Sequence, residues 1–312
     1  MKRGFVVVLS ALLLAACGGG GGGESGSGQS AEQGAAVTVD TRFGPVTIDE
    51  PPTRVVALGW SDAEAALALG VRPVGASDWL GFGGNGVGPW ADGLYEEAPK
   101  PLGTTEVDYE AVAALQPDLI LNTRSDNDEK KHETLSRIAP TIGAPKDVIP
   151  YGTTWKQQVE LVAKALGKVP EGEKIIKDLD AKFAENKKFD GRSTVVGAFF
   201  DGKFGAYVSG DSRTDFMKAV GFTPRAEVEA LASGTFYVDI SAERLDLLNA
   251  DLTVLFPIGG DASALRANPL VPPNALVLDD EDLVNAFSSG SALGTAYALD
   301  KAVPLFAQKL GL

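Results

Sequence analysis

The chain has 312 residues, 44% hydrophobic and 22% charged, which predicts about two globular domains and argues against disorder along most of its length. Its 42 acidic residues outnumber 28 lysines and arginines, for a net charge of −14, and this argues against a nucleic-acid-binding protein because that class needs a basic surface. A single cysteine excludes an intrachain disulfide framework, and with a single histidine the usual zinc clusters are excluded as well.

The N-terminal segment has the features of a secretion signal. Lys2 and Arg3 precede an apolar run over residues 5–16, which is too short to span a bilayer and ends in Leu-Ala-Ala-Cys at residues 14–17. This ending resembles a bacterial lipobox, which implies that Cys17 becomes the first residue of the mature chain and carries a lipid. The alternative is an ordinary secretory peptide with an incidental cysteine.

We therefore predict a lipoprotein signal peptide over residues 1–16. Residues 17–36 are then the lipidated cysteine and a flexible tether, since this stretch is rich in glycine and serine. The folded body is expected outside the cytoplasm, anchored to the cell membrane by the lipid on Cys17.

Residues 37–169 are predicted to form an N-terminal α/β lobe. The elements expected there are a hairpin (37–48), a strand (54–59), a helix (62–69) capped by Ser61, a strand (71–76), a helix (110–115), a strand (118–122) and a helix (128–138). Strands that alternate with helices in this way are typical of parallel βαβ units.

Residues 189–312 repeat this order and predict a C-terminal α/β lobe. The elements expected there are a strand (194–200), two helices (215–220 and 242–248), two strands (251–256 and 275–278) and a helical tail (293–310). Segments 110–121 and 243–254 also share Glu at the first position, an apolar residue two on, Leu five on, Asp eight on and Leu nine on. The predicted fold class is α/β, with two similar Rossmann-like lobes that have mainly parallel sheets.

A single long helix is expected between the lobes, over residues 170–188. Pro170 suits the first helical position, and the apolar residues Ile175, Ile176, Leu179 and Phe183 recur on one helical face. At 1.5 Å per residue such a helix is about 27 Å long. We expect a helix of this length to limit hinge motion between the lobes.

Several segments resemble one family, the solute-binding lipoproteins of ABC importers for ferric siderophores, haem or cobalamin. The matching segments are Pro-Thr-Arg-Val-Val-Ala-Leu-Gly (52–59), the stretch 62–75 that ends in Ala-Leu-Gly-Val-Arg-Pro-Val-Gly, Pro-Asp-Leu-Ile-Leu (117–121) and Ile-Ser-Ala-Glu-Arg-Leu (240–245). The resemblance implies two α/β lobes joined by one long helix, and a monomer that captures its ligand between them and delivers it to a membrane permease. It implies no catalysis, no cofactor and no protein-held metal. Residues 75–90 look most like the actinobacterial ferric-siderophore branch, and haem or cobalamin remain alternative ligands.

Ligands of open parallel sheets bind beyond the carboxyl ends of the strands, so residues at those ends are candidates for ligand contact. A ferric siderophore is bulky, partly apolar and often anionic, which favours aromatic faces and guanidinium groups as contacts. Each candidate has a structural alternative, because an aromatic ring can belong to the core and an arginine can be an ordinary surface charge. The candidates are Trp60, Trp79, Arg124, Tyr151, Phe200, Tyr207, Arg213, Phe236, Tyr237 and Phe287.

The resemblance also implies that a surface glutamate on each lobe docks on the permease. Glu64 occupies the matching Glu-x-x-x-Ala-Leu-Gly context in the first lobe. In the second lobe Lys218 stands where the acid is expected, and Asp215 is the nearest carboxylate. Glu64 and Asp215 are therefore the predicted docking residues.

Three further patterns receive structural interpretations. Residues 81–86 match G-x-G-x-x-G, but Pro89 follows where a dinucleotide site needs a helix, so we expect a flexible loop at the cleft mouth. His132 lies in a charged segment and is expected to be a solvated side chain. The acidic run 279–282 lacks the spaced ligands of a calcium loop and is expected to be a solvated turn.

Two other classes of function remain open. An extracytoplasmic enzyme is disfavoured because the only histidine is poorly placed as a base and no G-x-S-x-G elbow is present, although paired carboxylates for glycoside hydrolysis are compatible with 42 acidic residues. A cell-wall interaction protein that keeps the fold but has lost transport is the other alternative.

Overall fold

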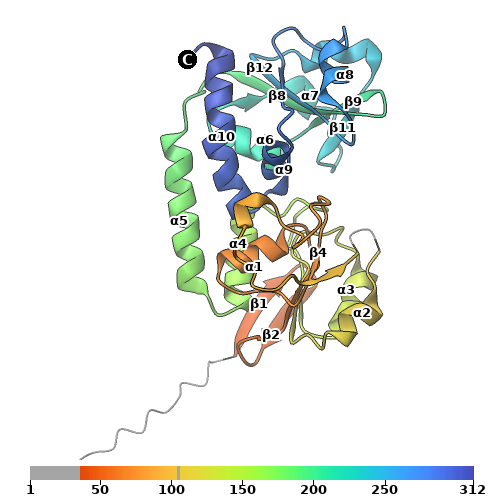
Figure 1. Cartoon of the computed structure of the whole chain (residues 1–312), viewed down its shortest axis with the longest axis vertical. Helices are drawn as coiled ribbons and strands as arrows, with labels where there is room; N and C mark the ends of the chain where they lie inside the picture. The colour runs from red at the N-terminus through yellow and green to blue at the C-terminus, as the bar shows by residue number, and fades with distance from the viewer. Residues whose placement is uncertain (1–35, 104–105) are drawn as a thin grey trace, which may run out of the picture. The chain divides into compact units, whose positions relative to one another are not determined.

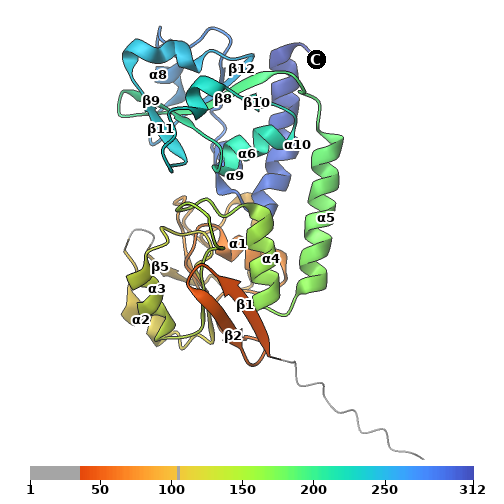
Figure 2. The ribbon, with the colours of Figure 1, turned by 180° about the vertical axis from the view of Figure 1, so that it is seen from behind.

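The computed structural model describes residues 36–103 and 106–312. Within this part the chain folds into two α/β lobes (Figures 1 and 2). The predicted signal peptide, Cys17 and nearly all of the predicted tether lie outside the described residues. None of the helices in the described ranges is long and apolar enough to cross a membrane.

The N-terminal lobe contains a five-stranded, all-parallel sheet in the order β5-β4-β3-β6-β7. Its strands are β3 (Val55–Ala57), β4 (Gly75–Ser77), β5 (Lys100–Leu102), β6 (Leu119–Leu121) and β7 (Thr141–Ile142), preceded by the antiparallel hairpin of β1 (Val37–Thr41) and β2 (Gly44–Ile48). Its helices are α1 (Asp62–Ala68), α2 (Tyr109–Ala114), α3 (Glu129–Ser136), α4 (Trp155–Ala165) and the 3₁₀ turn η1 (Pro89–Ala91). The predicted hairpin and parallel βαβ units are confirmed.

Both faces of this sheet are covered, because its central strands are apolar on both sides. Val55 and Leu119 pack with residues of α1 and α4, whereas Val56 and Ile120 pack on the other face with Val112 and Leu135 of α2 and α3. All strand residues of β3 and β6 are buried, as expected for strands in the middle of a parallel sheet.

The C-terminal lobe contains a mixed sheet in the order β11-β9-β8-β12-β13, with β10 pairing to β8. Its strands are β8 (Ser193–Phe200), β9 (Lys203–Tyr207), β10 (Thr223–Pro224), β11 (Tyr237–Ile240), β12 (Leu252–Pro257) and β13 (Leu276–Val277). Its helices are α6 (Ser212–Ala219), α7 (Ala226–Glu229), α8 (Ala262–Ala267), α9 (Glu281–Ser289), α10 (Ala292–Leu310) and the 3₁₀ helix η2 (Ala242–Leu248). Strand β9 is antiparallel to both β8 and β11, so the second lobe does not repeat the all-parallel sheet of the first.

One local arrangement is nevertheless common to both lobes. It involves the aspartate that the matching segments 110–121 and 243–254 share. Asp118, before β6, accepts hydrogen bonds from the backbone N–H and hydroxyl of Thr53, at 2.7 and 2.8 Å. Asp251, before β12, accepts the same two bonds from Ser193, at 2.7 and 2.8 Å. Each aspartate therefore fixes the start of the neighbouring parallel strand, which explains why the two segments share this residue.

Helix α5 (Val169–Glu185) is the predicted helix between the lobes, and it ends about one turn earlier than predicted. It lies alongside α10 in both views (Figures 1 and 2), where Lys182 forms a 2.7 Å ion pair with Asp300. Gly172 allows close contact with α4, since a Cβ atom there would lie 2.5 Å from the Cβ of Ala163. Leu179 and Phe183 of α5 belong to the C-terminal core together with Phe189, Phe256 and Phe306.

Two structural interpretations from the sequence are wrong. His132 is not solvated: it is 8% exposed, its ring stacks on Phe43 at 4.0 Å, and burial lowers its pKa. The acidic run 279–282 is exposed, as expected, but it is not a turn: it leads into α9, where the Asp280 side chain accepts a hydrogen bond from the backbone N–H of Leu283 at 3.0 Å. Acidic residues are favourable there because they face the positive end of the helix dipole.

Candidate ligand-binding site

Four aromatic side chains form a row that passes from one lobe to the other. Trp60 follows β3 and stacks on Trp79, which follows β4, with ring centroids 4.2 Å apart and an angle of 6°. The other face of Trp60 stacks on Tyr151 at 4.1 Å. Phe236 of the C-terminal lobe meets Tyr151 edge-on at 6.2 Å. We call these residues the aromatic row, and they are four of the predicted ligand contacts.

The backbone holds Trp60 tightly in the middle of this row. Its N–H donates to the carbonyl of Arg124 at 2.9 Å, and its carbonyl accepts from Nε2 of Gln158 on α4 at 2.9 Å. Gly59 is needed directly before it, because a Cβ atom there would lie 2.9 Å from the backbone nitrogen of Arg124. The ends of β3 and β6 and the start of α4 thus jointly fix the ring.

A buried aspartate supports the same corner of the lobe. Asp62, fully buried at the start of α1, accepts from the backbone N–H of Thr123 at 2.9 Å and from Nε2 of Gln158 at 2.8 Å, and it also bonds the Thr123 hydroxyl. Burial raises the pKa of Asp62, and these donors lower it only in part. Sequence reasoning did not single out Asp62 or Gln158, although Thr154-x-x-Gln157 is a capping-box signal for the helix that carries Gln158.

A second aromatic group lies in the C-terminal lobe. Tyr207 at the end of β9 and Tyr237 at the start of β11 are cross-strand partners with ring centroids 5.1 Å apart. Tyr237 lies over Gly205, where a Cβ atom would come within 1.9 Å of its hydroxyl oxygen. Tyr207 is 7% exposed and belongs to the core, so most of its surface is not available to a ligand, while Tyr237 is half-buried.

Arg124 is buried and bridges the two lobes rather than facing a cleft. It is 2% exposed; Nε donates to the carbonyl of Tyr151 at 3.0 Å, while Nη1 and Nη2 donate to the carbonyl of Ser289 at 2.6 Å and to the hydroxyl of Ser212 at 3.2 Å. The serines belong to α9 and α6 of the C-terminal lobe. Burial lowers the pKa of Arg124 to about 10.

Ser61 joins the aromatic row to the same bridge. Its hydroxyl donates to the Ser289 carbonyl at 2.7 Å and accepts from the indole N–H of Trp79 at 3.2 Å. The sequence predicted Ser61 as the cap of α1, but its side chain makes no capping hydrogen bond and its backbone is left-handed, with φ 61°. We refer to Ser61, Arg124 and Ser289 as the lobe junction.

Arg213 is also buried, at 6% exposure, but among the described residues its side chain bonds only within the C-terminal lobe. Its Nε and Nη2 donate to the two carboxylate oxygens of Asp211 at 2.9 and 2.8 Å, and its guanidinium carbon lies 3.6 Å from the centroid of the Tyr207 ring. Burial lowers the pKa of Arg213, but Asp211 and Tyr207 outweigh it and the net shift is upward. The expectation of two arginines directed at a ligand is not met in this structure.

Glu64 is not on the surface, so the prediction of a surface docking glutamate is wrong at this position. It is 3% exposed and accepts a hydrogen bond from the hydroxyl of Ser291, which caps α10 in the other lobe. Burial raises the pKa of Glu64, and the bond from Ser291 opposes this only in part. The second docking prediction, Asp215, remains a prediction.

Phe287 and Phe200 do not join the aromatic row. Phe287 is 2% exposed and packs edge-on against Phe216 at 5.2 Å in the C-terminal core. Phe200 is 57% exposed and is the last residue of β8. The second aromatic group is distant from it, because Tyr207 pairs with Val196, four residues earlier on the same strand. At about 3.3 Å per residue this separation is about 13 Å, because β9 returns antiparallel to β8.

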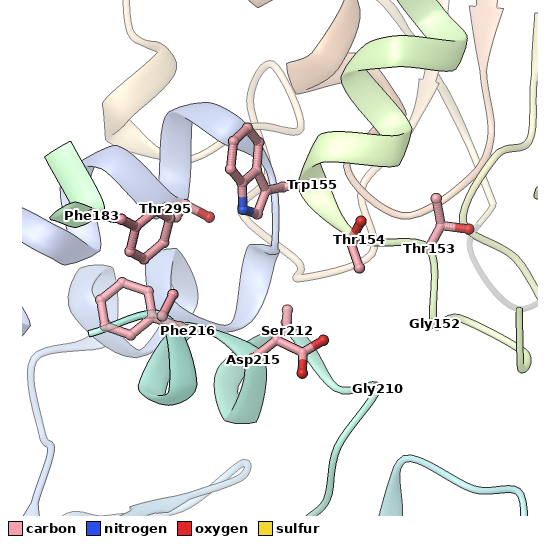
Figure 3. Close-up of a pocket in the computed structure, with 11 residues that line it drawn as sticks. Gly152, Thr153, Thr154, Trp155, Phe183, Gly210, Ser212, Asp215, Phe216 and Thr295 are labelled. Carbon is pink, nitrogen blue, oxygen red and sulfur yellow. The ribbon is translucent and has the colours of Figure 1, made fainter. Parts of the chain in front are cut away.

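A cavity of about 100 Å³ is lined by residues of both lobes, among them residues 152–155 (Figure 3). Trp155 of α4, Phe216 of α6 and Thr295 of α10 face it, as Figure 3 shows. Asp215 lines it as well and pairs with Lys218 at 3.2 Å. The four rings of the aromatic row are not among its lining residues.

Comparisons with known proteins agree with this architecture. The family model described as periplasmic binding protein matches residues 55–261. YfiY of Bacillus subtilis (strain 168), whose name describes a probable siderophore-binding lipoprotein, is 31% identical over 252 residues, covering 76% of this chain and 74% of YfiY.

Two solved structures have the same fold over most of their length. A periplasmic solute binding protein from Mycobacterium smegmatis str. MC2 155 superposes with a TM-score of 0.77 and 29% identity, covering 88% of this chain and 99% of that one. PiaA of Streptococcus pneumoniae TIGR4, solved in complex with ferrichrome, superposes with a TM-score of 0.75 and 25% identity over the same shares. With a family match over most of both lobes, this chain belongs to the periplasmic binding protein family.

Proposed function

We propose that this chain is an extracytoplasmic binding lipoprotein that captures a ferric siderophore and delivers it to an ABC-type permease. The single observation that carries the proposal is the aromatic row, because it supplies ring surface from both lobes at one place. Family membership, the name of YfiY and the ferrichrome bound to PiaA support this ligand class. Anchoring by a lipid on Cys17, a monomeric state and binding without catalysis are parts of the same proposal.

Tryptophan fluorescence tests the proposal, since two of the four tryptophans lie in the row. The purified protein is titrated with ferric hydroxamate, catecholate and carboxylate siderophores, haem and cobalamin. Saturable quenching by a ferric siderophore at micromolar concentration or below is the expected result. Quenching by haem or cobalamin alone would identify that compound as the ligand instead. The absence of quenching by every compound in the panel would contradict the proposal.

Replacing Trp79 tests the row itself. In Trp79→Ala we expect the affinity for the ferric siderophore to fall by about 1–3 kcal/mol, roughly five- to 150-fold, because a stacked ring surface is lost. Trp79→Phe keeps a ring but loses the hydrogen bond to Ser61, so it separates the two contributions. Unchanged affinity with a lower melting temperature in Trp79→Ala would assign Trp79 to the core. Isothermal titration calorimetry and thermal unfolding provide the two measurements.

A further inference from the structure

The two arginines between the strand ends have their side-chain hydrogen bonds satisfied by the protein, and Arg213 also has its charge paired. Each nitrogen of the Arg124 guanidinium donates to a protein oxygen, and Arg213 makes a two-point ion pair with Asp211. Both side chains are less than one-tenth exposed. A ligand that reaches the row therefore finds the N–H donors of both guanidinium groups already bound to protein oxygens.

Carboxylates act on Tyr151 of the aromatic row and on Tyr237, which follows Phe236 of the row in the chain. Burial raises the pKa of Tyr151, and the negative charge of Asp126 adds to that shift; the cation opposing it, Lys131, is already paired with Asp126 at 2.6 Å. Burial raises the pKa of Tyr237 to about 12, with Tyr207 and Asp239 adding to the shift and Arg213, which is paired with Asp211, opposing it. Asp239 is exposed on β11, two residues from Tyr237.

The net charge of a ferric chelate decides how well it suits such surroundings. A ferric tris-catecholate carries three negative charges, and ferric carboxylate chelates are anionic too, so each loses hydration without gaining a hydrogen bond from either guanidinium. A ferric tris-hydroxamate is uncharged, or positive where it has a pendant ammonium group. Its apolar spacers gain contact with ring faces, and an ammonium group is attracted by both rings and carboxylates.

We propose that the aromatic row selects uncharged or cationic ferric hydroxamates against anionic catecholate and carboxylate chelates. This inference rests on the proposed function and specifies its ligand class. It differs from the expectation of an anionic ligand held by two arginines, because both guanidinium groups bind protein oxygens instead.

A matched ligand panel tests the inference. The probes are ferrioxamine B with its pendant ammonium, its N-acetylated neutral derivative, ferrichrome, ferric enterobactin and ferric staphyloferrin B, titrated at one pH and ionic strength. We expect all three hydroxamates to bind, ferrioxamine B at least as tightly as its acetylated form, and both anionic chelates at least tenfold more weakly. If an anionic chelate binds as tightly as the best hydroxamate, the inference is wrong and the proposed function stands. If no chelate binds, the proposed function itself fails.

A single charge removal tests the electrostatic cause. Asp239→Asn should reduce the preference for ferrioxamine B over its acetylated form by about two- to fivefold, while ferrichrome affinity stays the same. Asp178→Asn is the matched control, because it removes the same charge from an exposed position on α5, where Asp178 pairs with Lys174. If both substitutions change this preference equally, or if Asp239→Asn does not change it, the charge of Asp239 does not contribute to the selection of cationic ligands.

Discussion

Glu64 shows how one buried carboxyl group depends on contacts from both lobes. It lies on α1 of the N-terminal lobe, and the hydroxyl of Ser291 at the start of α10 donates to it. Burial raises its pKa above the ordinary value of 4.5, because a charged carboxylate is poorly solvated there. The folded chain therefore holds this proton to a higher pH than the unfolded chain does.

This shift predicts a pH-dependent gain in Glu64→Gln. Between pH 4.5 and the raised pKa the folded state binds more protons than the unfolded state, so the contribution of Glu64 to stability falls as pH rises. Glutamine has a similar shape and does not titrate, so the free energy of unfolding of the variant, relative to the parent, should increase by up to about 1.4 kcal/mol for each unit of raised pKa.

Urea unfolding of both proteins from pH 4.5 upward measures this difference. Glu160→Gln, at an exposed position on α4, is the control for removing a carboxylate without burial. A stability difference between Glu64→Gln and the parent that stays constant over this pH range would contradict the assigned pKa direction.

At the scale of elements, two helices end in the same way but in different surroundings. Helix α9 ends at Gly290, with φ 59°, and α10 ends at Gly311, with φ 69°. Left-handed backbone favours glycine at both positions. A Cβ atom at Gly290 would lie 2.2 Å from Nη1 of Arg124, whereas a Cβ atom at Gly311 meets nothing within 4 Å.

Alanine at these two glycines separates backbone strain from crowding of the lobe junction. Both variants should lose about 1 kcal/mol or more from left-handed strain. Gly290→Ala should lose additional stability and weaken ligand binding, because Arg124 must move away from Ser289. Thermal unfolding and calorimetric affinity, measured on both variants, give the comparison. Equal losses of stability and unchanged affinity in both would show that crowding at Arg124 is unimportant.

The sequence predicted elements where the signal is local. The hairpin, the parallel units and α5 follow from periodicity and caps, and the shared aspartate of segments 110–121 and 243–254 marks one unit present in both lobes. Helix α4 had a capping-box signal that was not used. Strands β9 and β11 were not among the predicted elements, and their antiparallel direction could not be predicted either, because a strand sequence does not specify the direction of its partner.

Site prediction had the same limit. Trp60, Trp79, Tyr151 and Phe236 were found because ligands bind at strand ends and loops beside them. The positions of the Arg124 and Glu64 side chains depend on hydrogen bonds with Ser289 and Ser291. These partners are 165 and 227 residues away in the chain, respectively. No local sequence pattern encodes such a pairing. The sequence alone therefore could not show that Arg124 and Glu64 contact the other lobe instead of a ligand or a permease.

At the scale of the whole molecule, the two buried arginines differ in which parts of the chain they connect. Arg124 joins the N-terminal lobe to Ser289 and Ser212 of the C-terminal lobe. The side chain of Arg213 bonds Asp211, in its own lobe. Both are buried and hydrogen-bonded, so they form a matched pair for separating lobe spacing from general stability.

Arg124→Gln should loosen the lobes as well as destabilise the fold. The Ser289 carbonyl keeps its bond from Ser61 but loses the charged donor, which costs about 1–3 kcal/mol and removes most of the polar restraint at this junction. Spin labels on cysteines at Glu110 of α2 and Ala264 of α8, with Cys17 replaced by serine, report the distance between lobes by double electron–electron resonance. We expect a longer or broader distance distribution in Arg124→Gln.

The double variant Arg213→Gln with Asp211→Asn supplies the control, because it removes a buried ion pair without leaving an unpaired charge and asparagine still caps α6. This variant should lose stability but keep the parent distance distribution, since its contacts lie within one lobe. If both variants broaden the distribution equally, lobe spacing depends on the stability of the C-terminal lobe. If neither does, α5 and its contacts with α4 and α10 hold the lobes apart without help from Arg124.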